Sequence, residues 1–100
     1  MARVVVTDRA RADLDRLMVT HSLPGTTPQR VARALAPLAD FPALGAPLEG
    51  RWAPRRFVLG PWRWMLIVYI VDEARDLVVV LSMVDGRSAT SPTVDAGPDR

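Results

Sequence analysis

The chain has 100 residues, 49% of them hydrophobic, which is enough for one small domain with a single packed core. It has no cysteine, and this excludes disulfides, thiolate metal sites and cysteine nucleophiles. The net charge is only +2, but every basic side chain is an arginine, whose planar guanidinium suits phosphates and carboxylates. The longest apolar run, residues 64–71, is too short to span a bilayer, and we expect no secretory signal in MARVVVTDRA, whose apolar run is only a few residues long. We therefore expect a cytoplasmic protein with no membrane partner.

The first predicted elements are a short strand and a helix. Residues 2–7 (ARVVVT) are typical of a strand, and Thr7 or Asp8 can cap a helix from about residue 9 to residue 20. One apolar stripe recurs with the helical period: Ala10, Leu14, Leu17, Met18 and His21. The charged positions between them are expected to face solvent: Arg9, Arg11, Asp13, Asp15 and Arg16.

A second helix is predicted from about residue 28 to residue 36 or 39. Pro28 suits its first turn, and Pro37, which lacks an N–H group, should end or kink it. Two short helices with a tight link favour a helical hairpin whose apolar stripes pack on one face of a sheet. Residues 40–54 are rich in proline and glycine, and we expect them to form a loop.

Residues 55–87 contain three runs typical of strands: RRFVLG, PWRWMLIVYIV and LVVVLSMVDGR. The connections between them are short, so the runs predict a three-stranded antiparallel meander. The predicted fold class is α+β: an N-terminal strand, a helical hairpin, then the meander, with the helices packed on one sheet face. We expect residues 1–88 to form a single domain and residues 89–100 to be a disordered tail.

Side-chain alternation divides the long middle strand into two faces. One set is purely apolar and is predicted to lie beneath the helices: Trp62, Trp64, Leu66, Val68 and Ile70. The other set would form a partly exposed apolar floor of the kind that marks binding sites: Arg63, Met65, Ile67, Tyr69 and Val71. Tyr69 has an alternative interpretation as a core tyrosine whose hydroxyl is hydrogen-bonded.

The order of a strand, two helices and a meander resembles the RelE/ParE superfamily, the toxins of type II toxin–antitoxin operons, and the residues FPALGAPLEGRWAPRRFVLGPWRWMLIVYIVDE resemble the motifs of that family. The likeness covers roughly residues 2–88 and lies in short motifs: a proline-bearing loop, Leu-x-Gly, a Gly-aromatic-Arg turn and an apolar run ending in Tyr. PLEGRWAPRR is similar to the loop of YoeB-type members. The resemblance implies a cognate antitoxin as partner, and the ribosome with messenger RNA, or DNA gyrase, as target.

The sequence departs from the family at positions that RNA-cleaving members use. Ala46 stands where YoeB-like members have a glutamate, and Arg63 and Tyr69 are farther apart than usual. Ser88, Ala89 and Thr90 follow Arg87 in place of a C-terminal His and Tyr or Lys and Tyr. Three activities therefore stay open: messenger RNA cleavage, gyrase inhibition by binding, and a degenerate copy that only binds its antitoxin.

Cleavage of RNA by its own 2′-hydroxyl needs a proton acceptor, a proton donor and cations for the developing charge. The candidate catalytic residues are Arg63, Arg87, Arg56 and Glu49. The candidate contacts to nucleic acid or antitoxin are Arg55, Arg56, Arg63, Arg87, Met65, Ile67 and Tyr69. Adjacent strand residues point to opposite faces, so Arg55 and Arg56 cannot both join one site, and we favour Arg56.

The remaining polar and aromatic candidates have structural alternatives. Asp85 is a second acid–base candidate but is equally explained as a turn residue, and His21 is expected to be packed or to end a helix. The tryptophans could stack on bases, although such residues are more common in cores. No metal and no cofactor are expected, because the sequence has no metal-ligand cluster and no glycine-rich phosphate loop.

Overall fold

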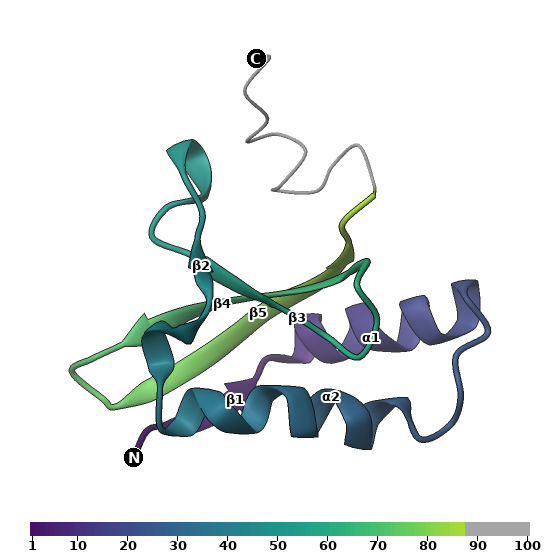
Figure 1. Cartoon of the computed structure of the whole chain (residues 1–100), viewed down its shortest axis with the longest axis horizontal. Coiled ribbons are helices and arrows are strands. Elements are labelled where there is room, and N and C mark those ends of the chain that lie inside the picture. Colours follow the sequence, from purple (N-terminus) through teal and green to yellow (C-terminus); the bar gives the residue numbers. More distant parts are fainter. Residues whose placement is uncertain (88–100) are drawn as a thin grey trace.

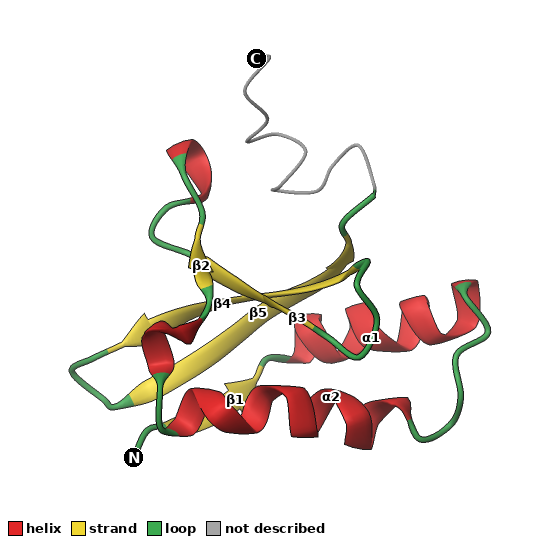
Figure 2. Cartoon of the chain, viewed as in Figure 1, coloured by secondary structure: helices red, strands yellow, loops and turns green. Residues whose placement is uncertain are grey.

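One mixed five-stranded sheet carries both long helices on the same side (Figures 1 and 2). The computed structural model describes residues 1–87, so the predicted tail at 89–100 lies outside the described residues. The elements are β1 (Arg3–Val6), α1 (Asp8–Thr20), α2 (Thr27–Leu35), β2 (Ala46–Pro47), β3 (Arg56–Leu59), β4 (Met65–Asp72) and β5 (Leu77–Asp85). Short 3-10 turns lie at Ala36–Ala39, Pro42–Leu44 and Gly50–Trp52.

The strands are arranged in the order β1-β5-β4-β3-β2. The predicted antiparallel meander is β3, β4 and β5, and β1 extends it as a parallel neighbour of β5. The predicted α+β class, with its helices on one sheet face, is confirmed. A fifth strand was not predicted: Ala46 and Pro47 pair with Phe57 and Arg56. Two residues are too few to show the alternation that identifies a strand.

Helix α1 begins as predicted, with Thr7 as its N-cap. The Thr7 hydroxyl accepts a hydrogen bond from the Ala10 N–H at 3.1 Å and donates one to the Val80 carbonyl at 2.8 Å. This single side chain therefore caps the helix and ties it to β5. Helix α2 passes at residue 36 into the 3-10 turn that contains Pro37, in agreement with a helix that changes near that proline.

Asp13 is not on the solvent face of α1, as its charge suggested, but is buried against the sheet. A register shift between Val68 and Tyr69 interrupts the ladder of β4 and β5. The Met83 N–H nearby donates to the Asp13 carboxylate at 3.1 Å. The carboxylate also pairs with Arg16, so its buried charge is compensated. Because β1 pairs with β5 only as far as Val80, the Met83 N–H has no strand partner on that side, and the buried Asp13 accepts its hydrogen bond instead.

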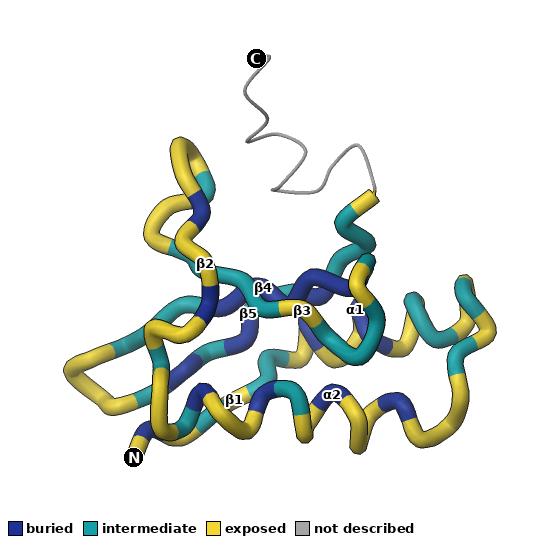
Figure 3. Tube along the Cα trace, viewed as in Figure 1, coloured by how far each residue is buried: buried dark blue, intermediate teal, exposed yellow. Residues whose placement is uncertain are grey.

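The core lies between the helices and β4–β5 (Figure 3). On β4 the residues that face the helices are Met65, Ile67 and Tyr69, each 0% exposed. The predicted assignment of the two faces was therefore wrong: Leu66, Val68 and Ile70 point away from the helices. Both sets are apolar, so alternation revealed two faces without telling which one the helices cover. Trp62 and Trp64 do pack against the core, but they precede β4, where strand alternation does not apply.

Tyr69 is a core tyrosine with a satisfied hydroxyl, as the alternative interpretation predicted. The hydroxyl donates to the Pro42 carbonyl at 2.7 Å and accepts from the Gly45 N–H at 2.8 Å. A Cβ atom at position 45 would lie 2.7 Å from that hydroxyl and 2.6 Å from the Phe57 carbonyl oxygen, so only glycine fits there. Tyr69 thereby fixes the loop that leads into β2.

Candidate functional site

The sheet face away from the helices, here called the open face, is not covered by α1 or α2. Its residues follow from the strand register: Phe57, Leu59, Leu66, Val68, Ser82 and Val84. The segment Glu49–Arg55 rises beside this face, on the side opposite α1 and α2 (Figure 1). The open face is therefore apolar at its centre and has a raised loop at one end.

A pocket of about 340 Å³, here called the arginine pocket, lies on the open face. Its lining comes from α1, the raised loop, β4 and β5: Thr7, Arg9, Trp52, Arg55, Val68, Leu81 and Ser82. Two of these residues are arginines, two carry hydroxyl groups, and none is acidic. The pocket therefore combines positive charge with an apolar floor.

Arg55 is held in this pocket by its own loop. Its guanidinium donates to the Trp52 carbonyl at 3.2 Å and lies 6.0 Å from the centroid of the Trp52 ring. The Trp52 indole nitrogen is buried and has no hydrogen-bond partner within residues 1–87. The buried indole N–H is not accessible to a ligand, but the guanidiniums that line the pocket are, and they can only donate hydrogen bonds. The pocket is therefore suited to a ligand that supplies acceptor oxygens and negative charge, such as a phosphate.

Arg56 lies on the other face of the sheet. It pairs in register with the buried Tyr69, and its guanidinium donates to the Gly45 carbonyl at 2.8 Å and the Ala43 carbonyl at 3.3 Å. Arg56 thus lies on the face of Tyr69, where the prediction placed it, whereas Arg55 lines the arginine pocket on the open face. Which of the two arginines contacts a ligand stays a prediction.

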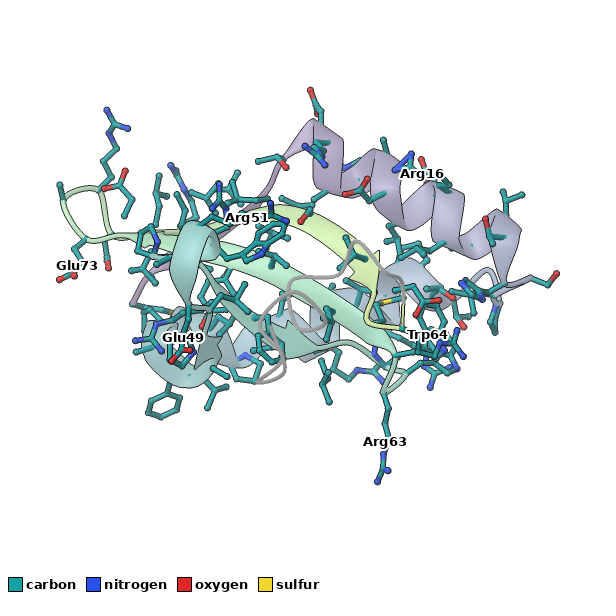
Figure 4. The ribbon with its side chains drawn as sticks, turned by 90° about the horizontal axis from the view of Figure 1, so that it is seen from above. Arg16, Glu49, Arg51, Arg63, Trp64 and Glu73 are labelled. Atoms are coloured by element: carbon teal, nitrogen blue, oxygen red, sulfur yellow. The ribbon has the colours of Figure 1, made fainter. Side chains whose placement is uncertain are left out.

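The four predicted catalytic residues do not form one group. Arg56 pairs with Tyr69 on β4. Arg87 comes two residues after Asp85, which pairs with Met65 at the other end of β4. Tyr69 and Met65 are about 13 Å apart along the strand. Figure 4 shows Glu49, the first residue of the raised loop, at one end of the sheet and Arg63 at the far end, pointing away from it. Arg63 and Arg87 share one end of the sheet, and Glu49 and Arg56 share the other.

The three apolar residues that were predicted to contact a partner are out of reach. Met65, Ile67 and Tyr69 are fully buried beneath the helices, so that prediction was wrong. Their apolar counterparts on the open face, Leu66 and Val68, lie outside the core cluster but are themselves buried, with 4% and 2% of their surface exposed. The exposed Leu59, which pairs with Leu66, continues this apolar strip toward the turn between β3 and β4.

A second polar group, here called the strand-end cluster, lies where β5 ends and consists of His21, Trp64, Asp85 and Arg87. Arg87 donates to both carboxylate oxygens of Asp85, at 3.0 and 2.9 Å. The His21 Nε2 atom is 3.5 Å from Asp85 Oδ2, and the His21 ring packs on Trp64 with centroids 4.2 Å apart. The hydrogen bond from Arg87 holds the pKa of Asp85 below its usual range, and Asp85 in turn raises the pKa of Arg87.

Sequence reasoning did not bring His21 and Asp85 together. His21 ends the apolar stripe of α1, and Asp85 precedes a glycine at a strand end, so each has a sufficient local explanation. Only the packing of α1 along β5 places the two side by side. Within the part of the chain that the structure describes, no group of three or more His, Asp or Glu residues is arranged to hold a metal ion. No helix there is long and apolar enough to cross a membrane.

Solved structures with the same arrangement of elements exist. A copper-bound mutant toxin from Helicobacter pylori matches with a TM-score of 0.64 and 19% identity, covering 85% of this chain and 94% of that one. A mutant of the Escherichia coli toxin RelE in the free state matches with a TM-score of 0.63 and 16% identity, covering 96% and 95%. The RelBE2 toxin–antitoxin complex of Mycobacterium tuberculosis gives 0.57 and 24%, covering 84% and 96%.

These matches extend over most of both chains in each pair and define the class of fold. The chain is a small α+β domain with two helices on one side of a mixed sheet. It has the RelE-type toxin fold, as the resemblance in its sequence predicted. No protein-family model matches the sequence, and no curated protein matches it.

Proposed function

We propose that this protein is the toxin of a type II toxin–antitoxin pair and that it acts on RNA. The fold it shares with RelE supports the toxin role, and the arginine pocket supports the choice of RNA. That pocket is the single observation that carries the proposal: Arg9 and Arg55 line it without any acidic residue. Two guanidiniums above an apolar floor suit a phosphate backbone with bases packed against it.

The proposed antitoxin covers the open face. An extended or helical segment with carboxylates would neutralise Arg9 and Arg55 and shield the exposed Leu59. One of the solved structures with this fold is a toxin–antitoxin complex, which supports a partner of this kind. Binding there would block the arginine pocket, so the same contact would both hold and silence the toxin.

A second candidate function is inhibition of DNA gyrase by binding. It is favoured by one feature of the arginine pocket, which has no histidine or carboxylate in its lining. A pocket without a proton acceptor can bind phosphate but lacks the group that activates a 2′-hydroxyl. A binding inhibitor needs no such group.

The test is induced expression of the protein in bacteria, with and without the antitoxin encoded beside it. We expect growth arrest with cut transcripts, and rescue by the antitoxin. Filamentation with DNA damage and intact transcripts would favour gyrase, and unhindered growth would contradict a toxin role.

Matched variants connect the outcome to the arginine pocket. Arg55→Ala should relieve the growth arrest. Arg33→Ala removes an exposed arginine from α2, beneath the other face of the sheet, and should leave the arrest unchanged. Equal toxicity of both variants would show that the pocket is not the site of action.

A further inference from the structure

We propose that the strand-end cluster is a proton-transfer site for RNA cleavage, with His21 as the catalytic acid–base group and Arg87 as the phosphate ligand. The inference rests on the proposed action on RNA. It adds the acid–base group that the lining of the arginine pocket lacks. His21 is the one histidine of the chain, and the fold brings it to the candidate phosphate-binding arginine.

The position of His21 is fixed from three sides. Its backbone N–H caps the end of α1 by donating to the Leu17 carbonyl at 3.0 Å. Its ring packs on Trp64 with centroids 4.2 Å apart, and its Nε2 atom faces Asp85 at 3.5 Å. A general base must be held by a third group in a fixed orientation, and an aspartate beside the imidazole is a common arrangement for this. Asp85 is therefore the positioning residue.

Charged and aromatic groups surround His21. Asp85, the carbonyl groups at the end of α1 and the face of the Trp64 ring all interact favourably with an imidazolium. Arg87, which follows β5, is the one arginine of the cluster, and its positive charge repels an imidazolium. Deprotonated His21 leaves the cluster close to neutral, and protonation of His21 makes it positive, which favours the negative charge of a phosphorane.

Arg87 has donors to spare for a phosphate. Its Nε and one terminal nitrogen donate to Asp85, and this bidentate contact leaves the other terminal nitrogen unengaged with Asp85. Its side chain is 63% exposed, whereas those of His21 and Asp85 are 25% and 21% exposed. The guanidinium is thus presented to solvent while the imidazole beside it is partly shielded.

The proposed step balances without any further reactant. His21 accepts the proton of the ribose 2′-hydroxyl, the O2′–P bond forms and the P–O5′ bond breaks. The imidazolium then gives its proton to the leaving 5′-oxygen. The products are a 2′,3′-cyclic phosphate and a 5′-hydroxyl, and His21 returns to its neutral form.

The experiment uses the full-length protein and a defined messenger RNA in a cell-free translation reaction. His21→Phe keeps an aromatic ring on Trp64 but cannot transfer a proton. We expect kcat to fall by about 10²-fold or more with little change in KM. Arg87→Ala should act mainly on KM. The wild-type pH–rate profile should show an acidic limb that disappears in His21→Phe, which a merely structural role of His21 would not cause.

The outcomes separate this inference from the function on which it rests. If wild-type protein arrests growth without cutting RNA, action by RNA cleavage fails and the inference fails with it. If wild-type protein cuts RNA and His21→Phe cuts it equally well, only the role of His21 fails. Co-purification with the antitoxin and circular dichroism check that the variant is folded. Should His21→Phe not fold, His21→Ala with added imidazole replaces it: rescue of cleavage supports the inference, and its absence in a folded variant overturns it.

Discussion

The two faces of the sheet have similar sequences but different surroundings. Beneath the helices, Met65, Ile67 and Tyr69 are sealed in the core, and the one polar atom among them, the Tyr69 hydroxyl, is fully hydrogen-bonded. The open face has an apolar centre as well, but its margin carries Arg9 and Arg55. The comparison shows that hydrophobicity alone does not distinguish the two faces, whereas the cations at the margin do.

The largest expected effect comes from deleting side-chain volume on the helix-covered face. Ile67→Ala should lower the free energy of unfolding by about 2–5 kcal/mol, because it leaves a cavity in a fully buried position. Leu59→Ala, on the open face where the side chain is 48% exposed, should change it by only about 0.5 kcal/mol or less. Urea denaturation of both variants measures the difference. Equal losses would mean that Leu59 is packed as tightly as Ile67.

The hydroxyl of Tyr69 should contribute measurably to the free energy of unfolding, but less than the side chain of Ile67 does. Tyr69→Phe removes the hydrogen bonds to Pro42 and Gly45 and should cost about 1–3 kcal/mol in unfolding free energy. Ser82→Ala on the open face is the matched control. It also removes one hydroxyl, but within residues 1–87 that hydroxyl has no comparable pair of buried hydrogen bonds. A loss as small as that of the control would contradict the anchoring role of Tyr69.

Arg55 and Arg56 allow the sharpest comparison of the two faces, since they are neighbours in sequence. Arg55→Ala should weaken RNA binding by about tenfold and make the logarithmic salt dependence shallower by about one counterion. Arg56→Ala should leave RNA binding unchanged and instead loosen the loop at Gly45, costing about 1 kcal/mol in stability. Filter binding over a range of salt concentrations measures RNA binding, and denaturation measures stability. If Arg56→Ala weakens RNA binding and Arg55→Ala does not, the RNA-binding face is the one of Arg56.

The smallest effect concerns alkaline pH. Burial raises the pKa of Tyr69, opposed by its hydrogen bond with Gly45 and the charge of Arg56. The folded protein therefore holds the tyrosine proton more tightly than the unfolded chain does. The stability this gives is fully present below the unfolded value of about 10 and is lost as the pH rises through the folded pKa. Unfolding free energy should decline above about pH 10 in the wild type and decline less in Tyr69→Phe.

Apart from the two-residue strand β2, the helices and strands were predictable, because each depends on local chemistry. The Thr7 cap, the prolines Pro28 and Pro37 near the two ends of the second helix, and the runs of β-branched residues between turns identify α1, α2 and the meander. The site was less predictable. Asp13 and Asp85 have ordinary local explanations as a surface charge and a turn residue, and their contacts with Met83 and His21 join distant parts of the chain.

The sequence by itself determined that this is a small α+β domain whose cations are all arginines and whose middle strand has two apolar faces. Tertiary structure alone decided which face the helices cover, and hence that Arg55 and not Arg56 belongs to the open face. The physical reason is that strand alternation fixes relative orientation but not absolute direction: where both faces are apolar, only the helices that pack on one of them break the symmetry. The same packing, of α1 along β5, sets His21 beside Asp85.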